Sequence, residues 1–303
     1  MKEIQDPITG NTKVKFVKEI NVNKLILGYK KVFDIDVKQL LFEDSVSLLE
    51  STQIGYQFYY PPLLGDDLFY QALENFPWYY AKNKWEHIIG QKLINHGDTL
   101  EVGCGNGEFL NKIKEKGIDS IGLDFNKSAV NNAREKGVEA YSHTLAEFIE
   151  THPNKKFDNI VLFQILEHIY DVGDFFKDVV KLLNSKGQII IAVPNNDSFV
   201  FNSMDSSSYH LDAHLLNMPP HHAGKWNKKS LTKLARHFNL QVDAVFYEPI
   251  YEVRIQLIAD NIMKRYFPIF RNNTFVKRKV LEFVTNHKNK FRGDSILISM
   301  TKI

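Results

Sequence analysis

The sequence contains one cysteine, no long hydrophobic run and almost no net charge. With Cys104 alone, an intrachain disulfide framework and a metal site built on several cysteines are both excluded. There is no run of about 18 uncharged apolar residues, and the first residues lack the apolar stretch of a signal peptide. These absences predict a cytoplasmic protein with no membrane span.

Charge balance and composition narrow the class of protein further. The 38 Lys and Arg residues nearly balance the 36 Asp and Glu residues, which leaves a formal net charge of +2 and no broad basic surface. We therefore expect no nucleic-acid partner. Because 44% of the residues are hydrophobic, the 303-residue chain can form one enlarged domain or two small ones.

From Thr99 onward, apolar runs alternate with amphipathic segments. The apolar runs predict strands over 99–102, 120–125, 138–143, 157–163, 188–195, 240–248 and 293–303. The amphipathic segments predict helices over 109–117, 126–137, 171–184 and 228–238. Strands and helices that alternate at this spacing predict an α/β fold with a parallel, doubly wound sheet.

Two regions lie outside this alternation. Residues 1–75 predict an accessory helical subdomain ahead of a main domain over 76–303. The first 97 residues contain two predicted helices, over 25–33 and 67–94, and short strand-like pieces over 46–51 and 56–62. Residues 250–292 predict a helical cap inserted between the last two strands.

The predicted cap has ten basic and three acidic residues. This excess fits either a solvated helical face or the attraction of an anionic acceptor. It also fits peripheral contact with anionic lipid headgroups.

The segment 101–107, EVGCGNG, predicts a nucleotide site. Its glycines let the backbone turn sharply and approach a ligand at the start of a helix. Asp124 ends the next strand about 20 residues later, where a carboxylate can bind ribose hydroxyls. A dinucleotide site favours a small residue where this chain has Glu108, so S-adenosylmethionine, which carries no phosphate, is the better match.

Three motifs together resemble a known family. They are EVGCGNGEF at 101–109, GLDFNKSAV at 122–130, and the segment 157–195, in which Leu166-Glu167-His168 follows the fourth strand. Over about residues 76–248 the chain resembles the class I S-adenosylmethionine-dependent methyltransferases, and among them the branch with this leucine-glutamate-histidine motif. The resemblance implies a seven-stranded, mostly parallel sheet.

The resemblance also implies an activity and a cofactor site. The activity is O-methylation of a hydroxyl on a sugar, a sugar nucleotide or a glycan precursor. Methylation of another small metabolite on oxygen or nitrogen, and a non-catalytic cofactor-binding scaffold, remain alternatives. The implied contacts are Glu101, Gly103, Gly105, Gly107, Gln164 and Tyr80 with the methionine moiety, Asp124 with the ribose, and Phe125, Leu145 and Ala146 with the adenine. For Tyr80, helix packing is an equal alternative.

Metal binding is not expected. Some members of the family carry paired cysteines for zinc in an N-terminal leader, and this chain lacks those cysteines. A cluster of His210, Asp212 and His214 could hold a divalent ion, but their loop spacing is unconstrained.

Methyl transfer to a hydroxyl also requires that the hydroxyl lose a proton, for which a histidine is the usual base. The segment from Pro219 to Trp226 resembles a family segment that faces the acceptor, so we expect His221 or His222 to act as base or substrate anchor. His168 matches the family motif and is either catalytic or a buried structural residue.

Overall fold

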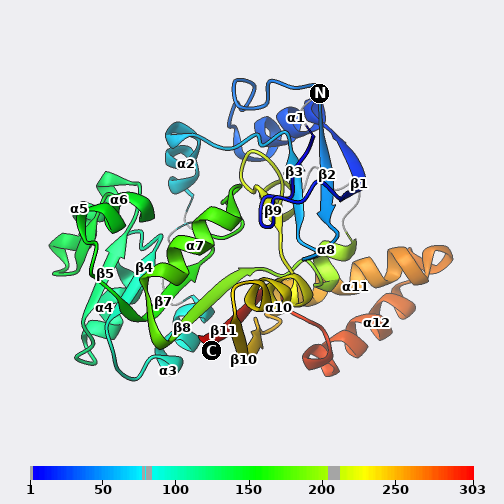
Figure 1. The fold of residues 1–303 in the computed structure, drawn as a ribbon. Helices are drawn as coiled ribbons and strands as arrows, with labels where there is room; N and C mark the ends of the chain where they lie inside the picture. The colour runs from blue at the N-terminus through cyan, green and yellow to red at the C-terminus, as the bar shows by residue number, and fades with distance from the viewer. Residues whose placement is uncertain (1–2, 77–78, 80–83, 204–211) are drawn as a thin grey trace.

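A seven-stranded sheet forms the centre of the computed structural model, which describes residues 3–76, 79, 84–203 and 212–303 (Figure 1). Its strands are β4 (Thr99–Val102), β5 (Ser120–Leu123), β6 (Glu139–Tyr141), β7 (Phe157–Phe163), β8 (Leu183–Pro194), β10 (Leu240–Tyr247) and β11 (Ser295–Lys302). They lie in the order β10-β11-β8-β7-β4-β5-β6, and β11 runs antiparallel to both of its neighbours while the other pairs are parallel. The predicted α/β fold with a mostly parallel sheet is confirmed.

Helices cover both faces of this sheet because its central strands are apolar on both sides. The helices are α3 (Trp85–Leu93), α4 (Glu108–Lys114), α5 (Lys127–Glu135), α6 (Leu145–Thr151), α7 (Val172–Leu182) and α10 (Lys228–His237). Along β7, Ile160 and Leu162 join the core under α6, α7 and α10, whereas Val161 and Phe163 join the core under α3, α4 and α5. The loops that follow the parallel strands therefore meet at one edge, where ligands bind in such sheets.

The N-terminal part contains a second sheet, which corrects the prediction of a mainly helical subdomain. Strands β1 (Val14–Asn21), β2 (Ser45–Ser51), β3 (Gln57–Tyr60) and β9 (Gly224–Lys225) pair antiparallel in that order, beside α1 (Val22–Phe33) and α2 (Asp67–Glu74). The edge strand β1 exposes most of its residues on both faces, so it has no buried alternation that a sequence pattern could reveal.

The helix predicted from residue 67 to 94 is also corrected, because α2 ends at Glu74 and α3 begins at Trp85. The sequence has Pro77 in this interval, and a proline inside a helix removes a hydrogen bond and clashes with the preceding turn.

The segment before β9 is held against the N-terminal part. The hydroxyl groups of Tyr29 and Tyr59 donate hydrogen bonds to the carbonyl oxygens of Leu215 and Asn217, both at 2.9 Å. Ile8, Tyr56 and Phe58 belong to the same core as the sheet residues of β7, so the N-terminal part packs directly on the main domain. The proposed boundary at residue 75 stays a prediction.

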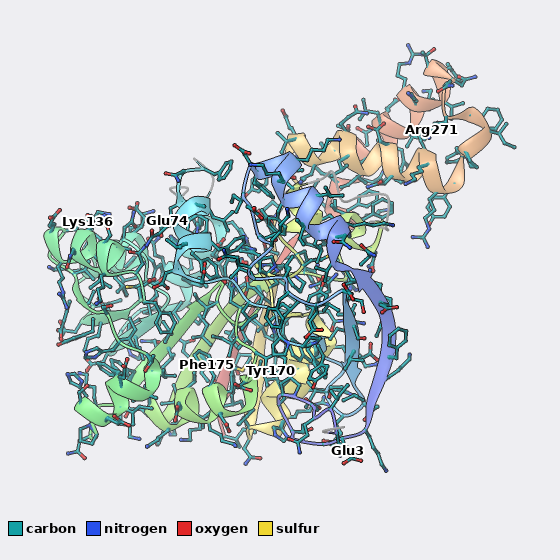
Figure 2. The ribbon with its side chains drawn as sticks, turned by 90° about the horizontal axis from the view of Figure 1, so that it is seen from above. Glu3, Glu74, Lys136, Tyr170, Phe175 and Arg271 are labelled. Atoms are coloured by element: carbon teal, nitrogen blue, oxygen red, sulfur yellow. The ribbon has the colours of Figure 1, made fainter. Side chains whose placement is uncertain are left out.

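The predicted cap is helical. It consists mainly of α11 (Glu252–Tyr266) and α12 (Thr274–Asn286), which share a small core with the short helix α8 (Phe199–Ser203). The cap projects from the body of the molecule, and Arg271 and Lys136 lie at opposite ends in Figure 2. Among the helices that the structure describes, none is both long and apolar enough to cross a membrane.

Candidate active site

The glycine loop between β4 and α4 adopts left-handed backbone angles. The φ angle is +79° at Gly103 and +72° at Gly107. A Cβ atom on Gly103 would lie 2.1 Å from the side chain of Ile165, and one on Gly107 would lie 2.9 Å from Ala133. Both positions therefore require glycine for conformation and for space, and the loop packs closely against the segment that follows β7.

Asp124, at the end of β5, holds the glycine loop in place. Its Oδ2 accepts a hydrogen bond from the backbone N–H of Gly105 at 2.7 Å, and its Oδ1 accepts one from Asn126 at 2.9 Å. Burial raises the pKa of Asp124, and these two N–H groups partly oppose that increase. The Asn126 side chain also caps α5 by accepting hydrogen bonds from the backbone N–H groups of Ser128 and Ala129.

The residues expected near an adenine differ in exposure. The Phe125 ring is 70% exposed and offers a free face beside Asp124. The Leu145 side chain packs in the main core, whereas Ala146 is exposed at the start of α6. Their contact with a cofactor stays a prediction. Tyr80 lies outside the described residues.

Two buried carboxyl groups lie on β4 and on the segment after β7. Glu101 on β4 is 3% exposed and Glu167, after β7, is 2% exposed. The Oε2 atoms of both are enclosed without a hydrogen-bond partner in the described part of the chain. Burial raises the pKa of Glu101 well above its ordinary range and that of Glu167 to about 8, although Lys84 lowers both. Such atoms favour a ligand that brings hydrogen-bond donors and positive charge.

Gln164 directly follows β7 and contacts a third buried carboxyl group, that of Glu86. The φ angle of Gln164 is +54°, which is uncommon for a residue other than glycine, and its backbone N–H donates to the Ala192 carbonyl at 2.8 Å. Its side chain hydrogen-bonds the buried carboxyl of Glu86, whose pKa is raised chiefly by burial. Strained backbone of this kind gathers at ligand sites, and the predicted contact of Gln164 with the methionine moiety stays a prediction.

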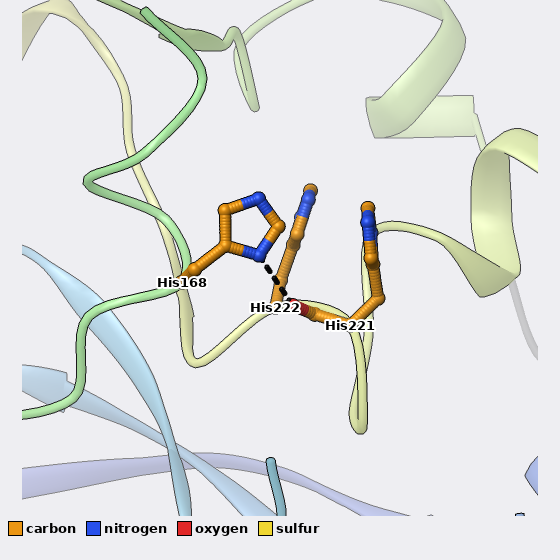
Figure 3. Close-up of side chains that lie close together, drawn as sticks. All are labelled: His168, His221 and His222. Carbon is orange, nitrogen blue, oxygen red and sulfur yellow. Dashed lines mark hydrogen bonds between the residues drawn. The ribbon is translucent and has the colours of Figure 1, made fainter. Parts of the chain in front are cut away.

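Three histidines named separately in the sequence analysis lie together in the structure (Figure 3). The ring centroid of His168 lies 4.8 Å from that of His221 and 4.9 Å from that of His222, and the latter two rings stack at 4.5 Å. The two segments that carry these residues are joined by a 2.8 Å hydrogen bond from the Ala223 N–H to the Glu167 carbonyl. We call His168, His221 and His222 the histidine cluster.

Each ring of the histidine cluster uses its Nδ1 atom in a hydrogen bond. Nδ1 of His168 lies 2.7 Å from the carbonyl oxygen of His221, Nδ1 of His221 lies 2.8 Å from that of Leu216, and Nδ1 of His222 lies 3.3 Å from Oδ1 of Asn217. Because carbonyl oxygens only accept, we assign the proton to Nδ1 and the free lone pair to Nε2 in each ring.

The histidine cluster is electrically neutral at pH 7. Burial lowers the pKa of His168 to about 4 and that of His221 to about 3, and it lowers the pKa of His222 well below its ordinary range. Neighbouring histidines lower the pKa of His221 and His222 further. Neutral rings with free Nε2 atoms can accept a hydrogen bond or bind a metal ion.

Tyr70 is a site residue that the sequence analysis missed. Its hydroxyl lies 3.2 Å from Nδ1 of His168 and 3.4 Å from the His221 carbonyl oxygen. One turn further along α2, Glu74 accepts a hydrogen bond from the side chain of Asn126, next to the Asp124 loop. Since residues four apart on a helix lie about 6 Å apart, α2 places the histidine cluster close to the glycine-loop region. In the sequence, the one sign that Tyr70 and Glu74 contact the site together is their i, i+4 spacing, which places them on one face of a helix.

A surface hollow lies between α8 and the cap. Its volume is about 460 Å³, and its lining includes Asp197 and the basic side chains of Arg265, Lys290 and Arg292. Arg292 forms an ion pair with Asp197 at 3.6 Å.

Hydrogen bonds lead from the histidine cluster toward this hollow. Asn217, the partner of His222, donates from its side chain to Oδ1 of Asn196 at 2.8 Å, and Asp197 follows Asn196 in the chain. Of the alternative metal residues, His210 lies outside the described part of the chain.

Residues 78–245 match the family model described as "Methyltransferase domain". The chain is 29% identical over 126 residues to a probable S-adenosylmethionine-dependent methyltransferase of Mycolicibacterium smegmatis, covering 39% of this chain and 48% of that protein. It is 25% identical over 135 residues to a ubiquinone biosynthesis O-methyltransferase of Bradyrhizobium diazoefficiens, covering 43% and 51%. The chain thus spans about half the length of these curated relatives.

Solved structures include a SAM-dependent methyltransferase from Archaeoglobus fulgidus with 21% identity and a TM-score of 0.46, covering 68% of this chain and 86% of that one. The family model covers more than half of the chain, and its description agrees with the family that the glycine loop and the motif after β7 predict. The chain therefore belongs to the methyltransferase domain family.

Proposed function

We propose that this protein transfers a methyl group from S-adenosylmethionine to a hydroxyl group of a small molecule, with a sugar, sugar nucleotide or glycan precursor as the preferred acceptor. One observation carries the proposal: within the described residues, Glu101 on the strand that leads into the glycine loop keeps a buried, unpaired oxygen, and Glu167 keeps another that shares Lys84 as a charged neighbour. A ligand with an ammonium group supplies the donors that these oxygens lack. The relatives named as S-adenosylmethionine-dependent methyltransferases and O-methyltransferases support the same activity.

The residues around the glycine loop, which we call the donor side, bind and orient S-adenosylmethionine. S-adenosylmethionine supplies a methyl group on a sulfonium: the acceptor oxygen bonds to the methyl carbon while the carbon–sulfur bond breaks, its electron pair stays on sulfur, and S-adenosylhomocysteine leaves. Glu101 accepts hydrogen bonds from the ammonium group, and Asp124 accepts them from the ribose. Gln164 closes the site at the methionine end of S-adenosylmethionine. The position of the sulfonium methyl group then fixes the line along which the acceptor oxygen must approach.

The histidine cluster is the acceptor side of this proposal. Tyr70 and Glu74 on α2 link it to the loop of Asp124, which supports an acceptor oxygen held by an Nε2 atom near the donor site. His221 or His222 accepts a hydrogen bond from the acceptor hydroxyl and receives its proton as the new bond forms. Because the pKa of His221 is about 3 without an acceptor, its larger contribution is to hold the hydroxyl in line.

The charge of the hollow supports an anionic acceptor. Arg265, Lys290 and Arg292 line it, and guanidinium and ammonium groups suit the phosphates of a sugar nucleotide. The series from His222 through Asn217 to Asn196 leads from the histidine cluster to this surface. An acceptor with a diphosphate in the hollow and a sugar hydroxyl at the cluster therefore matches both features.

Calorimetry and a methylation assay test the proposal. We expect S-adenosylhomocysteine to bind the wild type and the exposed control variant Glu135→Gln alike, and to bind Glu101→Gln about 10-fold or more weakly, because a charged hydrogen bond is lost. Mass spectrometry of reactions with sugar nucleotides, free sugars, phenols and amines then identifies the acceptor class. Methylation of phenols or amines alone would refute the sugar preference, and no binding of S-adenosylhomocysteine by the wild type would refute the activity.

A further inference from the structure

We propose that His168, His221 and His222 bind a divalent metal ion of the class that prefers imidazole, such as zinc, through their three Nε2 atoms. The binding follows from the geometry of the histidine cluster alone, whereas its part in catalysis rests on the proposed function. The sequence analysis expected no metal because the family's zinc cysteines are absent, and it did not place these three residues together.

The first reason to expect a metal ion is the short distance between the ring nitrogens. Nitrogen atoms from the three rings all lie within 4.8 Å of one another. A tetrahedral zinc ion with bonds of about 2.1 Å requires nitrogen atoms about 3.4 Å apart, so binding would require side-chain rotations that bring the three Nε2 atoms to that spacing. In Figure 3 the rings of His221 and His222 lie side by side and that of His168 lies next to them.

The backbone keeps the two segments of the cluster together. The Ala223 N–H bonds to the Glu167 carbonyl, and the indole N–H of Trp226 donates to the Leu166 carbonyl at 3.3 Å. The site is therefore assembled by the fold before any ion binds.

The second reason is that the hydrogen bonds of the Nδ1 atoms hold the three rings as they are held in metal sites. A histidine that binds a metal usually donates its other ring N–H to a carbonyl or carboxylate oxygen, which fixes the ring and its tautomer. All three rings have such a partner, since His168 and His221 face backbone carbonyls and His222 faces the side-chain oxygen of Asn217. The amide of Asn217 is itself held by Asn196 at 2.8 Å, so its oxygen stays directed at His222.

The third reason is that, among the described residues, the Nε2 atoms have no hydrogen-bond partner and can therefore bind an ion. Within the described chain, no hydrogen bond reaches Nε2 of His168, His221 or His222, since their bonds all use Nδ1. The described polar atoms that are fully enclosed and unpaired include Nδ1 of His87 but no atom of the cluster. Within the described residues, the three Nε2 lone pairs thus have no hydrogen-bond partner.

The donor set decides the class of metal. Imidazole nitrogens suit zinc, copper, nickel and iron, whereas magnesium and calcium prefer oxygen ligands. The surroundings offer charges of both signs, with the carboxyl of Glu167 next to His168 in the chain and the ammonium of Lys225 near His222.

Three protein ligands leave one position open for a water molecule or a substrate oxygen, as in catalytic zinc sites. Under the proposed function, that oxygen is the acceptor hydroxyl, and a divalent ion lowers the pKa of a hydroxyl that it binds. A bound ion would replace the direct contact of His221 or His222 with the hydroxyl, because their Nε2 lone pairs would then bind the ion.

Zinc titration of the full chain tests the site. After treatment with a chelator, the wild type and the control His96→Gln, whose exposed side chain lies outside the cluster, should each bind one zinc ion per chain. The variants His168→Gln, His221→Gln and His222→Gln should each bind zinc about 10-fold to 100-fold more weakly. Cobalt bound to the wild type should give the intense visible absorption of a four-coordinate site, a readout that needs no variant.

The outcomes separate this proposal from the proposed function. S-adenosylhomocysteine affinity, measured in the same samples, should stay within about twofold of wild type in every variant, which also shows that the variants are folded. Failure of the wild type to bind stoichiometric zinc, or equal zinc affinity in all variants, would overturn the metal site even if methyl transfer continues with chelator present. Zinc binding by the cluster in a protein that binds no S-adenosylhomocysteine would leave the metal site standing and overturn the activity.

Discussion

Replacing Glu101 by glutamine should make the free energy of unfolding less dependent on pH. Glu101 is 3% exposed, and burial raises the pKa of its carboxyl well above the ordinary value of 4.5. The folded chain therefore keeps this carboxyl protonated while the unfolded chain ionises it, so the wild type loses stability as the pH rises above about 4.5. One group titrating in one state changes the free energy by about 1.4 kcal/mol per pH unit.

Glutamine resembles the protonated carboxyl at every pH, so the Glu101→Gln variant lacks this loss. Urea unfolding from about pH 5 upward should therefore show Glu101→Gln gaining about 1.4 kcal/mol on the wild type per pH unit, until the folded pKa is reached. Glu135→Gln, with an exposed side chain on α5, should follow the wild type throughout. A difference between Glu101→Gln and wild type that stays constant with pH would refute the assignment of Glu101 as a protonated, buried acid.

Three further variants test other parts of the site. Asp124→Ala should weaken S-adenosylhomocysteine binding about 10-fold or more in calorimetry, because the ribose loses a charged acceptor, and unaltered affinity would refute the ribose contact. The double variant His221→Ala with His222→Ala should lower turnover about 100-fold while leaving that affinity within about twofold, and unchanged turnover would remove both from the acceptor site. Gly103→Ala should lower the free energy of unfolding about 1–3 kcal/mol more than Gly117→Ala in urea titrations. Both positions have a positive φ, but only the new Cβ at Gly103 meets Ile165, so equal losses would contradict this steric reason.

The central sheet could be predicted from the sequence because its signals are local. Residues 157–163 form an apolar run with a buried strand on each side, and the N-cap at Asn126 needs only the next three residues. The second sheet gives a weaker signal: strand-like pieces over 46–51 and 56–62 correspond to β2 and β3, but β1 and β9 could not be predicted. Its strand β9 has two residues, Gly224 and Lys225, and becomes a strand only through pairing with β3.

One part of the candidate site could likewise be predicted from a local sequence pattern, whereas the other part depends on contacts between distant segments. The glycine loop and Asp124 are separated by about 20 residues in one β-α-β unit, so a sequence pattern captures them together. His168 and His221 are far apart in the sequence, and their contact depends on the hydrogen bond between Ala223 and Glu167. The sequence could name each histidine as a candidate, but their joint use of Nδ1 follows only from the folded arrangement.

Because β9 pairs with β3, the residues proposed to bind the acceptor are attached to the N-terminal sheet, whereas those proposed to bind S-adenosylmethionine are attached to the central sheet. The glycine loop and Asp124 extend from the parallel sheet, whereas His221 and His222 precede a strand of the N-terminal sheet and lie near the anchoring hydroxyls of Tyr29 and Tyr59. Changes in the N-terminal sheet should therefore alter the positions of His221 and His222 more directly than that of the glycine loop. In a set of homologous enzymes built this way, acceptor choice would diversify through residues 14–60, far along the chain from every donor-binding motif.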